Sequence, residues 1–287
     1  MQDSGFVARS SLKSGAWTQT FISTVKLPIS GEIMVKILVV EDNEEFRAGA
    51  EQYFATRDDV EVVYAKDYKE AKAVLDTQAD TLDGAIVDFF FPMETGSGDT
   101  SLGRSLIERL VAEDPKEQNA RLIYEELSKH LDYKDKDVAA LAKRFAINYA
   151  NDIPDEGPSE ITVIKVLAQG SFGEKEFANH IFKNTFSRIP SMNNTKDHYG
   201  ALERGLAESE HNQPLGLSVA PKLKQYDIPF VYATSTFHHA ETGQKVHDYA
   251  NSKIGVPIVE CGANQENEKA TQEFWERAYT TLERNLK

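Results

Sequence analysis

The sequence predicts an α/β protein whose parallel sheet is covered by helices on both faces. Short apolar, β-branched runs, such as residues 35–40 and 85–91, are typical of strands that are buried on both sides. These runs alternate with segments whose apolar residues recur every three or four positions, as in residues 44–56. A parallel sheet follows, because the intervening helix returns the chain to the start of the next strand.

The N-terminal elements can be assigned in order. Val35–Val40 is the first strand and ends at the acidic turn Glu41–Asp42–Asn43. A helix with Phe46, Ala50, Tyr53 and Phe54 on one stripe should extend to about Thr56. The next elements expected are a strand at residues 60–64, a helix capped by Asp67, and a third strand at 85–91, which is apolar except for Asp88.

The same pattern resumes near the C-terminus. We expect a fourth strand at residues 230–234, a helix around Val246 and Tyr249, a fifth strand at 256–259, and a final helix carrying residues 270–282. Two segments could form the third helix of this unit, Ser101–Glu113 and Leu215–Gln225. We favour the first because it directly follows Gly96.

About a hundred residues between these halves fit none of the five expected strands. We interpret residues 116–214 as an inserted, mainly helical subdomain, which divides the α/β domain into residues 34–115 and 215–287. Its clearest helix is 137–150, and others are expected at 119–131, 175–188 and 196–208. Residues 161–167 are ambiguous, and 152–158 should be a loop. Residues 1–33 are interpreted as an upstream or artificially added extension with little fold of its own.

Composition excludes several classes of function. The net charge of −14 argues against nucleic acid as a partner, because phosphate binding requires clustered Lys and Arg. No stretch reaches the roughly 18 apolar residues of a membrane helix, so no membrane partner is expected. The single cysteine, Cys261, excludes an internal disulfide and fits a reducing compartment such as the cytoplasm.

Three separated places in the sequence resemble the receiver domain of two-component response regulators. Residues 36–43 look like the family's first strand and acidic pair. Asp88 is followed by Pro92 and Gly96 at the family's spacing, and residues 229–234 look like its fourth strand with the terminal hydroxyl residue, Thr234. The resemblance covers about 34–113 and 215–285. It implies the flavodoxin-like strand order 2-1-3-4-5.

The resemblance also implies a function. Asp88 would accept a phosphoryl group from a sensor histidine kinase or phosphotransfer protein, and Thr234 would hydrogen-bond a phosphoryl oxygen and act as the switch. Asp42 and Asp88 would bind Mg²⁺ directly, with Glu41 acting through water and the carbonyl of Phe90 completing the shell. Such a protein is not an enzyme with an external substrate; it signals to a protein target, here through the insertion.

The fifth strand departs from the receiver pattern. Receivers place a lysine at its end, where it pairs with the phosphoryl group, whereas this sequence offers Glu260 or Cys261. An acidic residue there would oppose anion binding. Either a lysine from elsewhere substitutes, Lys245 and Lys253 being nearest in sequence, or the site no longer takes phosphate. The alternative hypothesis is therefore a pseudo-receiver, a scaffold that binds partners independently of phosphorylation.

Other motifs favour ordinary structural roles. Residues 169–174 resemble part of a kinase glycine-rich loop but lack the accompanying kinase motifs. His130 and His180 lack the context of a phosphotransfer helix, and joint metal binding by the adjacent His238 and His239 is improbable on geometry. A hydrolase would need a general acid/base beside Asp88. The position where some aspartate-based phosphatases carry a second Asp is occupied by Phe90.

Overall fold

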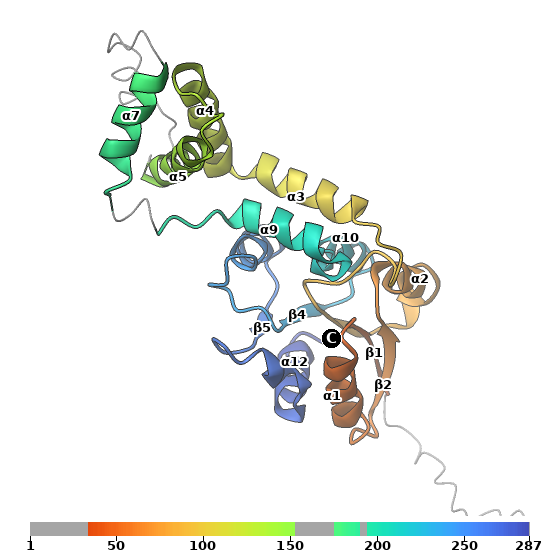
Figure 1. The fold of residues 1–287 in the computed structure, drawn as a ribbon. Coiled ribbons are helices and arrows are strands. Elements are labelled where there is room, and N and C mark those ends of the chain that lie inside the picture. Colours follow the sequence, from red (N-terminus) through yellow and green to blue (C-terminus); the bar gives the residue numbers. More distant parts are fainter. Residues whose placement is uncertain (1–33, 153–174, 190–193, 287) are drawn as a thin grey trace, which may run out of the picture. The chain divides into compact units, whose positions relative to one another are not determined.

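A computed structural model describes residues 34–152, 175–189 and 194–286, and it confirms the predicted fold class (Figure 1). The described residues form an all-parallel, five-stranded sheet in the order β2-β1-β3-β4-β5. Its strands are β1 (Val35–Val40), β2 (Val60–Ala65), β3 (Gly84–Val87), β4 (Phe230–Thr234) and β5 (Ile258–Glu260). The order reverses between β1 and β3, and the ends of these two central strands are where ligands bind in such sheets.

Helices connect the strands and cover both faces of the sheet. Those around the sheet are α1 (Glu44–Phe54), α2 (Tyr68–Gln78), η1 (Ala79–Thr81), α3 (Ser101–Glu113), α9 (His198–Glu208), η2 (Glu210–Asn212), α10 (Gly216–Gln225), α11 (Gln244–Tyr249), η3 (Ala250–Ile254), η4 (Glu266–Ala270) and α12 (Gln272–Glu283). Both candidates for the third helix are thus helical, as α3 and α10. Asp67 caps α2 as predicted, accepting a hydrogen bond from Glu70 N.

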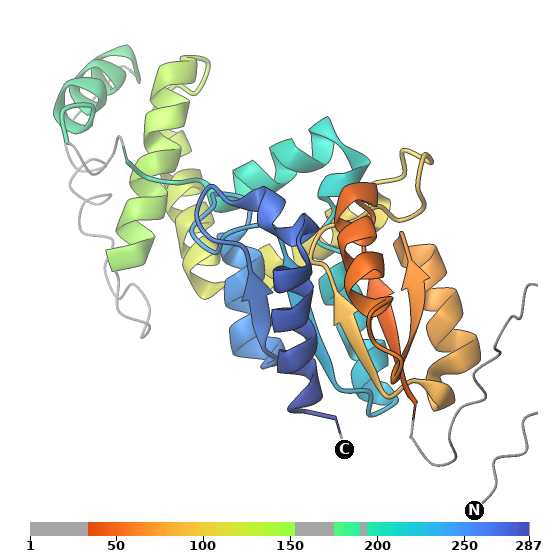
Figure 2. The ribbon, with the colours of Figure 1, turned by 90° about the horizontal axis from the view of Figure 1, so that it is seen from below.

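Alternation along each strand divides the apolar residues between two cores. Leu38, Val40 and Val87 face one core with α2, α3, α9 and α10, whereas Ile37 and Val39 face the other with α1 and α12. Figure 1 shows α1 and α12 on the opposite side of the sheet from α9 and α10. In Figure 2, which is seen from below, α1 (orange-red) and α12 (dark blue) lie in front of the sheet. The central strands are consequently buried on both faces, which explains their continuous apolar runs.

Two strands differ from their predicted bounds by two residues or more at one end, whereas β2 is one residue longer than expected. The third strand was expected to reach Phe91 but leaves the sheet after Val87, because the backbone beyond it pairs with a later segment: Phe91 N donates to Gln213 O and Gly216 N donates to Phe89 O. The fifth strand begins at Ile258 and includes Glu260, two residues later than expected at its start. In both cases the apolar run in the sequence is longer than the paired strand: residues 89–91 follow β3 and residues 256–257 precede β5.

The inserted segment has an apolar core of its own. Helices α4 (Pro115–His130), α5 (Lys136–Asp152) and α7 (Lys175–Phe186) confirm three of the predicted helices and pack around Ile123, Val138, Phe145 and Phe182. Helix α9, also predicted, instead contributes Tyr199, Leu202 and Leu206 to a core of the sheet. The expectations for residues 161–167 and 169–174, and nearly all of 152–158, lie outside the described residues.

Among the described residues, no helix has the length and apolar character needed to cross a membrane.

Candidate functional site

Three carboxylates meet at the carboxyl ends of the two central strands. Glu41 and Asp42 directly follow β1, and Asp88 directly follows β3. Glu41 is fully buried and Asp88 is 6% exposed. One ligand oxygen from each of the three residues lies within 4.8 Å of the others. The sequence-predicted acids are therefore brought together in space, as expected for parallel strands that end at the same edge.

A lysine reaches these acids from the segment between β5 and α12. The ammonium Nζ of Lys269 lies 2.6 Å from Glu41 Oε2 and 3.0 Å from Asp88 Oδ2, and the side chain is completely buried. Its ammonium also lies 5.6 Å from the centroid of the Phe46 ring, a cation–π distance. A buried lysine thus lies beside the acids, although residues 260 and 261 do not provide one.

The local sequence explains how Lys269 enters the interior. The indole Nε1 of Trp275 donates to Lys269 O at 2.7 Å, and Thr271 caps α12 immediately afterwards. Gly49 allows η4 to approach α1, because a Cβ at that position would lie 2.4 Å from Ala270 O. Residues 261–271 therefore fold back over the carboxyl end of the sheet, and Lys269 reaches the acids from η4, just before the last helix.

The electrostatics of this cluster follow from one cation among several acids. Burial raises the pKa of Glu41 to about 8, although Lys269 opposes the shift. Burial, and then the Asp88 charge, raise the pKa of Asp42 as well. Burial alone would lower the pKa of Lys269, but the Asp88 and Glu41 carboxylates outweigh burial and raise it. Lys269 therefore stays protonated and positively charged, and Glu41 is the group that can retain a proton near neutral pH.

The cluster also has unused bonding capacity. Glu41 Oε2 and Lys269 Nζ form the ion pairs already described and, within the described part of the chain, neither has a further hydrogen-bond partner. Buried polar atoms usually have such a partner, so these atoms favour an additional ligand. Oxygen-only donors suit a hard divalent cation such as Mg²⁺, which commonly binds through one or two carboxylates and keeps several waters. Asp42 and Asp88 would hold it, with Glu41 shared with Lys269.

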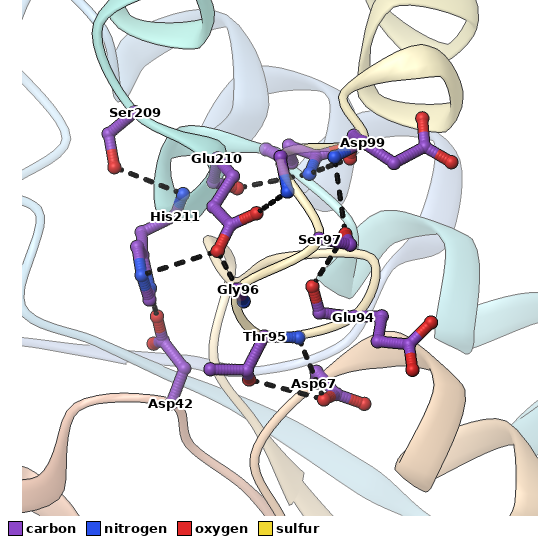
Figure 3. A network of polar contacts seen from close by, with 12 residues as sticks. Asp42, Asp67, Glu94, Thr95, Gly96, Ser97, Asp99, Ser209, Glu210 and His211 are labelled. Carbon is purple, nitrogen blue, oxygen red and sulfur yellow. Dashed lines mark hydrogen bonds and ion pairs between the residues drawn. The ribbon is translucent and has the colours of Figure 1, made fainter.

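Asp42 has a partner that the sequence did not indicate. The imidazole Nδ1 of His211, in η2, lies 2.5 Å from Asp42 Oδ2 (Figure 3). The neighbouring Glu210 accepts hydrogen bonds from Gly96 N and Gly98 N in the loop that follows β3. The segment that returns from the insertion therefore touches both the acidic cluster and the loop beyond Asp88.

A cavity of about 730 Å³ opens beside the acids. Glu41, Asp42 and Asp88 lie on one side, and α9 contributes Arg204 and its neighbours to the other. Phe90, whose carbonyl is a predicted metal ligand, also lines this cavity. The cavity is large enough for a phosphoryl group with its cation and water, and it gives Asp88 a route to solvent.

Thr234 lies at the end of β4 as predicted and is fully buried. Its hydroxyl accepts a hydrogen bond from Thr236 N at 3.1 Å, and no hydrogen bond joins it to Asp88 among the described residues. Ser235 and Thr236, one and two residues later, line the cavity. The structure thus places three hydroxyl residues at this strand end, and the role expected of Thr234 stays a prediction.

The remaining candidate residues lie outside the acidic cluster. Glu260, at the end of β5, accepts from His238 N and lies 2.6 Å from His238 Nδ1. Lys245 pairs with Asp114 at 2.7 Å, and Lys253 is exposed in η3. His130 and His180 lie on α4 and α7 of the insertion. Neither Lys245 nor Lys253, the lysines expected to substitute for the one missing at residues 260 and 261, supplies the cation beside Glu41 and Asp88.

Comparisons of the chain with protein-family models, with curated proteins and with solved structures found no match.

Proposed function

We propose that this protein is a response-regulator receiver that accepts a phosphoryl group on Asp88, with Mg²⁺, in cytoplasmic phosphorelay signalling. One observation carries the proposal: Lys269 Nζ lies 3.0 Å from Asp88 Oδ2 and 2.6 Å from Glu41 Oε2, at the carboxyl ends of the central strands. A buried carboxylate beside a fixed cation, with more acids for a divalent ion, is the equipment that phosphoryl transfer to aspartate requires.

The chemistry follows from these positions. An oxygen of Asp88 attacks the phosphorus of a phosphohistidine or of a small acyl phosphate, and forms an O–P bond as the bond to the donor breaks and the donor keeps the electron pair. The Asp88 Oδ1 atom accepts from Phe89 N at 2.7 Å, which fixes the carboxylate plane. Lys269 then offsets the charge of the phosphoryl oxygens. A bound Mg²⁺ supplies further positive charge at the same oxygens.

The partners belong to the same proposal. The phosphodonor is a sensor histidine kinase or a phosphotransfer protein, and the signal is passed to a protein target through the helical insertion. The separate apolar core of α4, α5 and α7 supports this role, because those helices can present a surface without disturbing the sheet. The protein does not act on an external substrate.

The pseudo-receiver remains the alternative, and its main support was the absence of a lysine at residues 260 and 261. Lys269 weakens that support, because the site has a buried cation after all. Binding of a partner that is indifferent to phosphorylation would favour the scaffold.

The proposal is tested by incubating the full chain with acetyl phosphate and Mg²⁺ and measuring the intact mass. We expect an increase of one phosphoryl group that hydroxylamine removes, as it does from acyl phosphates. The increase should vanish in Asp88→Asn and persist in Asp80→Asn, a matched change at an exposed position. If acetyl phosphate and a phosphorylated phosphotransfer protein both leave the wild-type mass unchanged, the proposal is wrong.

A further inference from the structure

The segment Ser209–Gly216, which we call the return segment, connects α9 to α10 and runs along the exit of β3. Phe91 N donates to Gln213 O at 3.1 Å, and Gly216 N donates to Phe89 O at 3.1 Å. A Cβ at Gly216 would lie 2.1 Å from Asp88 O, so only glycine allows this approach. The chain that leaves the insertion is therefore fixed against the backbone of Asp88 itself.

The return segment also contacts the loop that follows Asp88. The Glu210 carboxylate accepts from Gly96 N at 2.6 Å and from Gly98 N, and both glycines have positive φ angles, which orient these N–H groups toward it (Figure 3). The Gln213 side chain donates to Asp99 O and accepts from Gly103 N. These contacts fix the loop and the start of α3 to the return segment.

Through His211, the return segment also contacts Asp42, a proposed metal ligand. Its Nδ1 lies 2.5 Å from Asp42 Oδ2, and a carboxylate can only accept, so the ring donates. Mg²⁺ requires oxygen ligands in octahedral geometry and keeps several bound waters, so it needs room around Asp42. The His211 ring lines the cavity on that side and holds one of the two Asp42 oxygens.

The other end of α9 is tied to the insertion. Asn212 Nδ2 donates to Gly205 O at 2.9 Å, which joins the return segment to α9. At the start of α9, Asp197 caps the helix and pairs with Lys143 of α5 at 2.6 Å. An uninterrupted series of bonded residues thus runs from Asp42 through His211 and α9 to the helical insertion.

We propose that the return segment is an autoinhibitory coupler: in the closed form His211 occupies Asp42 while Glu210 clamps the loop after Asp88, so cation binding and the closed form oppose each other. Occupation of the site releases the return segment, and α9 passes the change to α5. This inference deepens the proposed receiver function and rests on it for the identity of the site. A change that lowers the population of the closed form must therefore tighten the apparent affinity for the cation, because a larger fraction of the protein is then competent to bind it.

The test is titration of the full chain with Mg²⁺ by calorimetry, with no phosphodonor present. His211→Ala should bind Mg²⁺ several-fold more tightly than wild type. Glu210→Gln is the sharper variant, because it removes a negative charge near the site and simple Coulomb attraction would make binding weaker. Coupling predicts tighter binding for Glu210→Gln as well. His130→Ala, on α4, is the matched control and should leave the affinity unchanged.

Hydrogen exchange gives an independent readout. In the wild type, saturating Mg²⁺ should speed exchange of residues 205–216 and of the loop at 94–100. Unchanged or weaker Mg²⁺ affinity in both variants, unchanged exchange, or no Mg²⁺ binding by any variant would each overturn the coupler. Tighter binding in the variants without any phosphorylation of Asp88 would leave the coupler standing and overturn the proposed receiver function instead.

Discussion

Lys269 balances the charge of two of the three acids in the site. It is the cation that contacts both Glu41 and Asp88, and all of its contacts lie in the interior. A buried ion pair adds little net stability relative to apolar residues, but removal of one member leaves an uncompensated charge. Its retention inside the protein is therefore better explained by function than by stability.

We expect Lys269→Met to lower the free energy of unfolding by about 3 kcal/mol, because the buried Asp88 carboxylate then lacks its cation and Glu41 loses its partner. The double variant Lys269→Met with Glu41→Gln should recover much of that loss, since it also removes an acid. Urea unfolding, monitored by fluorescence of the buried Trp275, measures both. A double variant no more stable than Lys269→Met would contradict the assigned ion pair.

Stability should also fall as pH rises through the range set by Glu41. The folded pKa of Glu41, about 8, is above its ordinary value of 4.5, so the folded state binds the extra proton. The corresponding stabilisation is fully present below 4.5 and is lost as pH rises through about 8, with a slope of up to about 1.4 kcal/mol per pH unit for one proton. Urea unfolding measured at about three pH values between pH 6 and pH 8.5 should show this decline in the free energy of unfolding. The decline should be absent in Glu41→Gln. Equal slopes in the two proteins would exclude Glu41 as the titrating group.

At the scale of elements, the site depends on how closely η4 approaches α1. Gly49 lies in α1, and an added Cβ would meet the Ala270 backbone at 2.4 Å. Because Ala270 follows Lys269 directly, any displacement of η4 moves the lysine. Packing between these two elements therefore determines the distance from Lys269 to Asp88.

Gly49→Ala should consequently destabilise the protein by about 1–3 kcal/mol, despite the better helix propensity of alanine. It should also slow phosphorylation of Asp88 by acetyl phosphate. Gly205→Ala, in α9, is the matched control: its Cβ would meet Asn212 Cβ at 3.6 Å, an ordinary contact, so its stability should be unchanged or higher by up to about 1 kcal/mol. Thermal unfolding of both variants decides the matter, and similar effects in both would refute this account of Gly49.

Elements that are buried on a regular face could be predicted from the sequence, whereas contacts made by polar segments distant in sequence could not. The strands and helices of the sheet were predictable because burial on one or both faces leaves a period in the sequence, as in Val35–Val40 and Glu44–Phe54. The acids were predictable because they directly follow strands. Lys269 was not, since it lies in a polar segment, Glu266–Ala270, whose fold depends on packing against Gly49 and Trp275. His211 was missed for a similar reason: its contact spans 169 positions in sequence.

At the scale of the whole molecule, Asp114 joins the sheet-bound and inserted helices. It caps α4 by accepting from Lys116 N and Glu117 N, and its Oδ2 contacts Lys245 at 2.7 Å and the Tyr199 hydroxyl at 3.2 Å. Burial would raise the pKa of Asp114, but these partners outweigh it and the pKa is lowered. One carboxylate thus links α4 to both α9 and α11.

We expect Asp114→Ala to cost about 1–2 kcal/mol, mainly through the lost helix cap. Hydrogen exchange should become faster at the start of α4. Asp114→Asn retains a capping oxygen and should cost less, which separates the cap from the ion pair. If exchange in α4 is the same in all three proteins, Asp114 does not hold the junction.

The central claim is that Asp88, Lys269 and Mg²⁺ together bind a phosphoryl group. Fluorine NMR of the full chain with beryllofluoride, a phosphoryl mimic, tests it most directly. The account predicts a bound fluoride resonance that requires Mg²⁺ in the wild type, is absent from Asp88→Asn and is greatly weakened in Lys269→Met. A wild-type protein that shows no bound resonance at saturating Mg²⁺ and beryllofluoride would contradict it.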